Sequence, residues 1–258
     1  LISCPGPFRQ AANMSERVKN MVENKTCGRC KWITAHSGCQ GKPDNSEDHI
    51  RAAAASGADV LEIDVRRVQG DLLLTHNDPE DPASCVSLKE CFRLVKELSG
   101  QIRINCDLKH EGLERDVLAL AEQEKMQGRI ILTGTVAPEL LETIPEWVMV
   151  SMNVENLLPG VYEAAEARGE LRMTEEEETL LLEKARRYGV SSLNMNYRYF
   201  HRGLWQKMAD AGIAFSLWTA NDEETIRRLL AYDLENLTTR MPVFACRVRA
   251  ELAGNPCR

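Results

Sequence analysis

Short apolar runs of the β type alternate with helical patterns along most of the chain. The β runs lie at residues 31–35, 60–65, 102–108, 130–133, 148–151, 192–194, 214–218 and 236–238, which makes eight. Capped and periodic patterns at 48–56, 88–98, 113–123 and 175–188 predict helices between several of these runs. Because strands that alternate with helices form parallel sheets, the pattern predicts an α/β fold.

A ninth β-like run, at 71–75, follows the second predicted strand. Only Val68, Gln69 and Gly70 separate the two, whereas a parallel crossover needs about a dozen residues or more. We therefore expect this run to fold back as a hairpin. Eight parallel strands with one extra hairpin strand favour a closed (β/α)8 TIM barrel over an open doubly wound sheet.

Composition agrees with one barrel domain. The chain has 258 residues, and a (β/α)8 barrel needs about 250. We assign the barrel to residues 31–258 and a polar N-terminal extension, with one short helix at 15–24, to residues 1–30. A hydrophobic fraction of 43% and a charged fraction of 28% are typical of globular proteins. The sequence itself indicates no oligomeric state.

The charge and the apolar pattern exclude two classes of partner. A formal charge of -7 argues against sequence-independent binding of nucleic acid, which depends on clustered Lys and Arg. No apolar run reaches the ~18 residues of a membrane span. The nine cysteines are an odd number and lie mostly in apolar or helical stretches, so reduced thiols and a cytoplasmic location are expected. Because the chain starts at Leu1 without Met, secretion after removal of a leader is the alternative.

Polar residues gather where the predicted strands end, which is where barrel enzymes place their reacting groups. These residues are His36, Glu62, Asp64, His76, Asp107 and Lys109. Side chains alternate along a strand, so Glu62 and Asp64 face the same side, as do Asp107 and Lys109. Three converging carboxylates repel one another unless a proton or a cation lies between them. Ligands that are all oxygen predict one divalent cation, Mg²⁺ or Ca²⁺.

Pairs of acidic residues two positions apart also occur by chance in a chain with 39 Asp and Glu. Glu175 and Glu177 form such a pair after Thr174, in the pattern of a helix N-terminus whose acids favour the helix dipole. Glu62 and Asp64 differ because they lie inside an apolar β run, where burying carboxylates without a partner is costly.

Six short motifs occur in an order that resembles the glycerophosphodiester phosphodiesterase family, from about residue 33 to 242. They are Ala35-His36-Ser37-Gly38, Asp44-Asn45-Ser46, Leu61-Glu62-Ile63-Asp64-Val65, His76-Asn77-Asp78, Asn105-Cys106-Asp107-Leu108-Lys109 and Leu217-Trp218-Thr219-Ala220-Asn221. Each motif is weak alone, and their common order makes the resemblance specific.

The resemblance implies roles for eight residues. Glu62, Asp64 and Asp107 would hold the divalent metal, and His36 and His76 would be the acid and the base. Histidine suits proton transfer because its pKa is ~6.5. On the substrate side, Ser37, Lys109 and Trp218 would contact a small phosphodiester. The implied reaction is hydrolysis of a glycerophosphodiester-like substrate to an alcohol and a phosphomonoester.

The sequence departs from the family pattern at several places. Ser37 stands where the family has Arg, which removes a guanidinium that can hold phosphate with two hydrogen bonds. Asp107 replaces a Glu and is one methylene shorter. The segment 77–85 is short where relatives insert a module over the substrate, which predicts an open site. The last strand lacks the family's acid, and Arg240 supplies a cation there instead.

Two rival functions follow from the same residues. A lysophospholipase D or phosphoinositide-type lipase would yield a cyclic phosphate, and an apolar rim beside the pocket would favour it. A catalytically inactive barrel would bind a phosphorylated ligand without cleaving it, as Ser37 in place of Arg and the altered last strand suggest. Retention of both histidines and three carboxylates argues against inactivity.

Other candidates carry less weight. Cys27 and Cys30 have the spacing of a redox or zinc motif, but they precede a strand and no second pair accompanies them. His49 lies within a helix pattern and is expected to be a satisfied residue rather than a ligand. His110 should point away from the mouth of the barrel, whereas His201 is in a position to rim the pocket.

Overall fold

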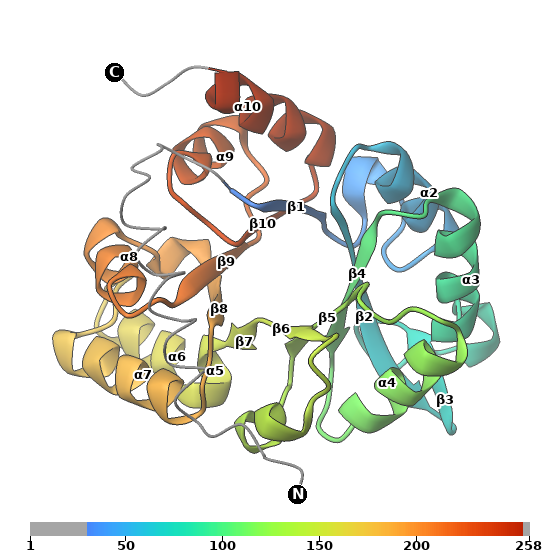
Figure 1. Ribbon diagram of the computed structural model, residues 1–258, viewed down its shortest axis with the longest axis horizontal. Helices are drawn as coiled ribbons and strands as arrows, with labels where there is room; N and C mark the ends of the chain where they lie inside the picture. Colours follow the sequence, from blue (N-terminus) through green and yellow to red (C-terminus); the bar gives the residue numbers. More distant parts are fainter. Residues whose placement is uncertain (1–29, 255–258) are drawn as a thin grey trace, which may run out of the picture.

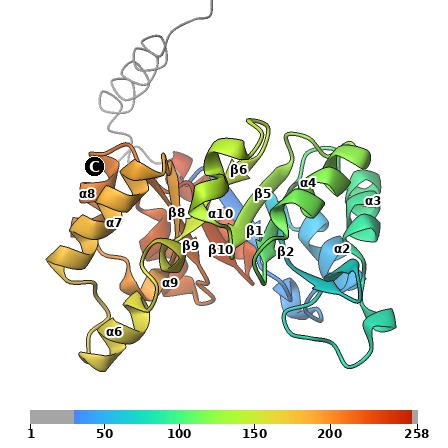
Figure 2. The ribbon, with the colours of Figure 1, turned by 90° about the horizontal axis from the view of Figure 1, so that it is seen from below.

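The computed structural model describes residues 30–254, which form a ring of parallel strands surrounded by helices (Figures 1 and 2). The strands of the ring are β1 (Trp32–Ala35), β2 (Val60–Val68), β4 (Arg103–Leu108), β5 (Ile130–Gly134), β6 (Met149–Val150), β7 (Met152–Asn153), β8 (Ser192–Asn196), β9 (Ala214–Trp218) and β10 (Asn236–Thr239). The predicted helix at 15–24 and Cys27 lie outside the described residues.

The ring closes through one broken strand. The strands are ordered β6-β5-β4-β2-β1-β10-β9-β8-β7, and only Ser151 separates β6 from β7 along the chain. The Ser151 N–H donates to Leu132 O of β5 at 3.1 Å. Because β6 and β7 are two parts of one strand, the ring has eight positions, and the predicted (β/α)8 barrel is confirmed.

The extra strand is the predicted hairpin. β3 (Asp71–Leu74) pairs antiparallel with the end of β2, with Val68 opposite Asp71. β2 pairs with β4 as far as Val65 and continues beyond it as the first strand of this hairpin. His76 lies two residues after the end of β3.

Helices pack on the outside of the ring. They are α2 (Glu47–Ala55), α3 (Leu88–Leu98), α4 (Glu114–Gln123), α5 (Val154–Leu157), α6 (Val161–Ala167), α7 (Glu175–Arg187), α8 (Arg202–Ala209), α9 (Glu223–Leu230) and α10 (Pro242–Gly254). The four helices predicted within the barrel agree with α2, α3, α4 and α7. A 3-10 segment, η3 (Pro138–Thr143), connects β5 to β6 in place of an α-helix.

The helix starts follow the sequence signals. Ser87 and Glu90 form a capping box at α3, and Thr174 and Glu177 form one at α7. Each pair satisfies backbone N–H groups that have no partner within the helix. The acids at 175–178 therefore belong to the first turn of α7, as expected, and not to the cavity.

Apolar and polar side chains separate across β2. Leu61, Ile63 and Val65 are fully buried in the apolar core. The alternating residues Glu62 and Asp64 face the inside of the ring and line its cavity. Burial of Leu61, Ile63 and Val65 outside the ring thus fixes which face of β2 turns outward, and the alternating carboxylates point into the cavity.

Neutral polar side chains fill the inside of the ring, and three of them, Asn153, Asn194 and Thr238, also line its cavity. Their hydrogen bonds run from Thr34 Oγ1 to Asn236 Oδ1 (2.6 Å), from Asn236 Nδ2 to Ser216 Oγ and Thr238 Oγ1 (both 3.0 Å), from Ser216 Oγ to Asn194 Oδ1 (2.9 Å), and from Asn194 Nδ2 to Asn153 Oδ1 (2.8 Å). The chain of bonds crosses β1, β10, β9, β8 and β7. It satisfies these buried groups and ties five strands together.

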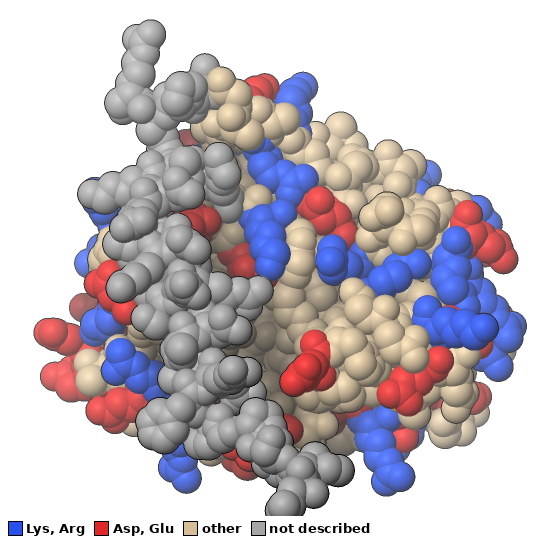
Figure 3. Space-filling model, in the orientation of Figure 1, with Lys and Arg blue, Asp and Glu red and all other residues tan. Residues whose placement is uncertain are grey.

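Charges on the outer surface are mixed. On the face in Figure 3, basic side chains gather near the right edge, where acidic side chains lie among them. Around α3, Arg93 and Lys96 both pair with Glu124, at 3.7 and 3.0 Å. None of the described helices is long and apolar enough to cross a membrane.

Replacing Asn236 with Ala should destabilise the barrel. The change removes three hydrogen bonds and leaves the buried Thr34 and Ser216 hydroxyls without that partner. We expect the free energy of unfolding in urea to fall by about 1–3 kcal/mol. The exposed Asn77→Ala change should alter it by less than about 0.5 kcal/mol. Equal stability of the two variants would contradict the role of the network.

Candidate active site

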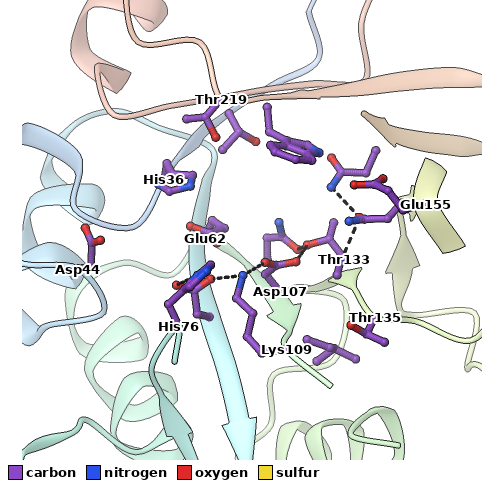
Figure 4. A pocket seen from close by; sticks show the side chains of 18 of the residues that line it. His36, Asp44, Glu62, His76, Asp107, Lys109, Thr133, Thr135, Glu155 and Thr219 are labelled. Atoms are coloured by element: carbon purple, nitrogen blue, oxygen red, sulfur yellow. Dashed lines mark hydrogen bonds and ion pairs between the residues drawn. The ribbon is translucent and has the colours of Figure 1, made fainter. Parts of the chain in front are cut away.

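A cavity of about 620 Å³ lies at the carboxyl ends of the strands. Seven of the eight predicted site residues line it: His36, Glu62, Asp64, His76, Asp107, Lys109 and Trp218 (Figure 4). The eighth, Ser37, is only 1% exposed and lies outside the lining.

Three carboxylates meet at one point of the cavity. Glu62 and Asp64 lie on the inner face of β2, and Asp107 of β4 is the register partner of Asp64. One oxygen from each carboxylate lies within 4.8 Å of the others, so the shorter Asp107 side chain still reaches the cluster. Two oxygens on opposite sides of one Ca²⁺ lie about twice the Ca²⁺–O bond length apart, roughly 4.8 Å, so separations within this limit allow a single ion to contact all three carboxylates. The donor set therefore fits one hard divalent cation.

Lys109 balances part of the negative charge. Its ammonium contacts Asp107 and lies 2.7 Å from Asp64 Oδ1. Three ionised carboxylates and one ammonium carry a formal charge of -2, which would balance the +2 of the cation that the cluster would hold. The residues of the cluster thus match such an ion in charge as well as in donor type.

The three acids do not ionise equally. Burial raises the pKa of Glu62 well above its usual range, and the charges of Asp64 and Asp107 raise it further. Burial also opposes ionisation of Asp64, but the Lys109 ammonium and hydrogen bonds from Lys109 and Asn45 outweigh it and lower the pKa of Asp64. Without a bound cation, the surroundings of Glu62 therefore disfavour the ionised form of its carboxyl group.

Asn45 and Ser37 hold the β2 carboxylates in place. Asn45 donates from Nδ2 to Asp64 Oδ2 at 2.8 Å, and its Oδ1 accepts the Asp64 N–H at 2.9 Å. The Ser37 N–H donates to Glu62 Oε2 at 2.7 Å, and Ser37 Oγ accepts the Asn45 N–H at 2.9 Å. Through its N–H, Ser37 therefore positions the carboxylate of Glu62, a predicted metal ligand.

Neighbouring strand β5 supports Asp107. The Thr133 hydroxyl lies 3.0 Å from Asp107 Oδ1 and 3.0 Å from Asn105 Oδ1. Gly134 follows with φ +77, and a Cβ there would lie 2.5 Å from Asp107 Oδ1 and 2.3 Å from Leu108 O. Only glycine leaves room for the Asp107 carboxylate at this point.

The two histidines have different surroundings. His36 Nδ1 lies 2.8 Å from the Ser37 carbonyl oxygen, so a proton on Nδ1 leaves Nε2 with its lone pair. Burial lowers the pKa of His36 and favours this neutral form. The His76 side chain is 64% exposed, with Nδ1 at 3.4 Å from Asp64 Oδ2. In Figure 4, Glu62 lies between the two rings in projection.

Arg240 brings a second cation to the cavity. Its Nη2 lies 3.1 Å from Asp44 Oδ2, and its Nε lies 3.4 Å from His36 Nδ1. Since His36 Nδ1 donates to the Ser37 carbonyl, the approach of Arg240 to the ring is a contact rather than a good hydrogen bond. The guanidinium keeps donors available for a ligand.

The remaining sequence candidates lie away from the cavity lining. His49 is buried in α2 with Nε2 at 3.1 Å from Glu62 O. His110 Nε2 accepts the Arg67 N–H, and His201 pairs with Glu178 at 2.9 Å, so His201 does not rim the pocket. Cys30 is buried, and burial raises the pKa of its thiol to about 12.

Sequence reasoning missed the lining contributed by β5, β7 and β8. These residues include Thr133, Thr135, Asn153, Glu155, Asn156 and Asn194. Asn153 ends β7, and Glu155 and Asn156 lie in α5, which follows it directly at the end of a barrel strand. The signal was present, but the predicted fifth strand stopped at residue 151, two positions before the observed end.

Comparison with known proteins identifies the fold. No family model and no curated protein matches the sequence. Solved structures do match: a glycerophosphodiester phosphodiesterase from Parabacteroides distasonis has a TM-score of 0.63 at 17% identity, covering 88% of this chain and 99% of that chain. The fold is that of the glycerophosphodiester phosphodiesterases.

Two further glycerophosphodiester phosphodiesterase-like structures agree. The enzyme from Agrobacterium tumefaciens has a TM-score of 0.62 at 15% identity, with 84% and 98% of the two chains covered. An Oleispira antarctica phosphodiesterase, in complex with the product sn-glycerol-3-phosphate, has a TM-score of 0.64 at 16% identity, with 85% and 96% covered. The fold implied by the six motifs is therefore confirmed.

Replacing Gly134 with Ala should weaken cation binding. The new Cβ would collide with the Asp107 carboxylate, so we expect Mg²⁺ and Ca²⁺ affinity, measured by calorimetry, to fall at least tenfold. Gly128→Ala is the matched control because Gly128 has φ +76 with nothing within 4 Å of the added atom. Both variants should lose about 1–2 kcal/mol of stability from the left-handed backbone. Gly134→Ala should lose more than this, because its Cβ would also lie 2.3 Å from the Leu108 carbonyl oxygen. Equal cation affinity in the two variants would contradict the role of Asp107.

Proposed function

We propose that the protein is a metal-dependent phosphoric diester hydrolase that cleaves a glycerophosphodiester-like substrate to an alcohol and a phosphomonoester. The observation that carries the proposal is the joint placement of Glu62, Asp64 and Asp107 with both histidines on one cavity. The shared fold supports it, as does the phosphomonoester product in the Oleispira antarctica structure.

Glu62, Asp64 and Asp107 would hold one Mg²⁺ or Ca²⁺. When bound, such an ion stabilises the negative charge that builds up on phosphoryl oxygens during the reaction. The three carboxylates would hold such an ion at one place, because Asn45, Ser37 and Thr133 fix their side chains.

The chain's own cations bind the phosphate. Lys109 lies beside the carboxylate cluster, and Arg240 lies beside His36. Together they supply charge from two sides of the cavity, and the planar Arg240 group can donate two hydrogen bonds to phosphate oxygens. Arg240 thus takes the part that an Arg at position 37 would have taken.

The histidines transfer protons. Neutral His36 presents Nε2 as an acceptor for a proton, and His76, on the exposed side of the cluster, serves the second oxygen of the reaction. Such transfers contribute roughly 10²- to 10⁴-fold to a rate. If the attacking oxygen is water, the product is a phosphomonoester. If it is a substrate hydroxyl, the product is a cyclic phosphate.

Hydrolysis should depend on a divalent cation and on both histidines. We expect EDTA to abolish cleavage of glycerophosphodiesters and added Mg²⁺ or Ca²⁺ to restore it. Glu62→Gln should weaken cation binding, and His36→Ala or His76→Ala should lower kcat by roughly 10²- to 10⁴-fold. Glu175→Gln, at an exposed acid of α7, is the control and should leave kcat unchanged.

The same assay separates the rival functions. Phosphorus NMR of the products distinguishes a phosphomonoester from a cyclic phosphate. Activity that survives both EDTA and His36→Ala would refute the mechanism. A folded protein that binds sn-glycerol-3-phosphate but cleaves no diester would be an inactive barrel.

Arg240→Ala should weaken substrate binding more than it slows the chemical step. Loss of the guanidinium removes a charged donor from the cavity, so we expect KM to rise about 10- to 100-fold, corresponding to about 1.5–3 kcal/mol for a hydrogen bond to a charged group. Arg67→Ala is the control, because Arg67 pairs with Asp116 outside the cavity. A KM unchanged by Arg240→Ala would exclude Arg240 from the phosphate site.

A further inference from the structure

His76 is held less firmly than the other residues of the proposed reacting centre. It lies in the loop between β3 and the 3-10 segment η2 (Pro82–Ser84), and its side chain is 64% exposed. Its Nδ1 lies 3.4 Å from Asp64 Oδ2, which is long for a hydrogen bond. Proton transfer requires the ring within hydrogen-bonding reach of a reacting oxygen. The position of the ring therefore depends on what holds the backbone of this loop.

Arg66 links the loop to the strand that carries two predicted metal ligands. It lies in β2 two residues after Asp64 and on the same face, because side chains alternate along a strand. Its Nη2 donates to the His76 carbonyl oxygen at 3.0 Å, and its Nη1 lies 3.4 Å from Asp78 Oδ1. One planar guanidinium thus contacts the loop on both sides of Asn77.

The two contacts of Arg66 differ in strength. The Asp78 side chain is 87% exposed, so water and salt weaken the ion pair. The Arg66 side chain is only 20% exposed, and a hydrogen bond from a charged donor is stronger than one between neutral groups. The bond to the His76 carbonyl oxygen is therefore the firmer of the two.

The Nε group of Arg66 shows that the guanidinium is not placed for contact with water. This nitrogen is shielded from solvent and has no hydrogen-bond partner within residues 30–254. A buried donor without a partner is unfavourable, and an arginine that faced solvent would keep its donors hydrated. The Nη contacts to the loop offset this loss. The side chain is therefore placed by the loop that it holds.

Other bonds fix the start of the loop and its internal shape. The Thr75 N–H donates to the Asp64 carbonyl oxygen at 3.1 Å. The Thr75 hydroxyl donates to the Asn77 carbonyl oxygen at 2.7 Å, which is a bond within the loop. Arg66 adds the restraint that these bonds lack, because it ties the backbone of His76 itself to a side chain of β2.

We propose that Arg66 is a positioning residue that holds His76 in place for proton transfer. Arg66 lies outside the cavity lining, so it acts through the His76 backbone and not on the substrate. The inference deepens the proposed function and rests on it for the role of His76. The restraint of the loop by Arg66 does not depend on catalysis.

Arg66→Gln should lower kcat for glycerophosphocholine more than it changes KM. We expect a loss in kcat of about 10- to 100-fold with KM within about threefold, because a catalytic group displaced by about 1 Å can cost roughly 10²-fold in rate. Arg66→Lys keeps the charge and a donor, so it should recover part of kcat. Arg67→Gln is the matched control, because the neighbouring Arg67 pairs with Asp116 outside the cavity. It should leave kcat unchanged.

A double-mutant cycle separates positioning from general destabilisation. In the His76→Ala background, Arg66→Gln should lower kcat by less than about twofold, because the ring that Arg66 positions is gone while the loop backbone remains. The same loss in both backgrounds would overturn the proposal, as would an unchanged kcat in Arg66→Gln alone. Circular dichroism should show that each variant is folded.

Hydrogen exchange tests the restraint without catalysis. The amides of residues 75–81 should exchange at least about fivefold faster in Arg66→Gln, because the loop loses its bond to β2, and at the original rate in Arg67→Gln. Faster exchange in a protein that cleaves no diester would place the failure in the proposed function and leave the restraint intact. Exchange unchanged by Arg66→Gln would overturn the positioning role, even in an active hydrolase.

Discussion

Mutual repulsion among Glu62, Asp64 and Asp107 is the constraint on which the rest of the site depends. Their oxygens lie within 4.8 Å of one another in a largely buried place. Such a cluster exists only where other groups offset its charge, and Lys109 does so directly. Backbone N–H groups, Asn45 and Thr133 supply further donors. The local structure is therefore organised around holding negative charge ready for a cation.

The polar interior of the barrel serves the same end. Asn, Ser and Thr side chains of five strands bond to one another inside the ring, and these side chains carry no charge. Neutral partners also add no charge that would compete with the cluster. The interior of the barrel is therefore polar, and hydrogen bonds among its side chains hold them in place next to the charged groups.

Periodicity predicted the ring, because eight β-type runs alternate with helix patterns along most of the chain. It also placed Glu62 and Asp64 on one face of β2, because side chains two residues apart in a strand point to the same side. It could not find the end of the fifth strand, because β6 and β7 are two residues each and break at Ser151. The function of Ser37 was likewise invisible, because its partners Asn45 and Glu62 come from different elements and meet only in the folded chain.

Ser37 and Arg240 together explain how the site departs from the family pattern. Ser37 is buried, and its hydroxyl accepts the Asn45 N–H, so an Arg side chain at this position would lose that bond. β1 and β10 are neighbours with Ala35 opposite Thr239, and the His36 N–H donates to Thr239 O at 2.9 Å. The residue after Thr239 therefore lies beside His36. The Arg240 cation reaches the cavity from the adjacent strand, while Ser37 supports the Glu62 carboxylate and Asn45.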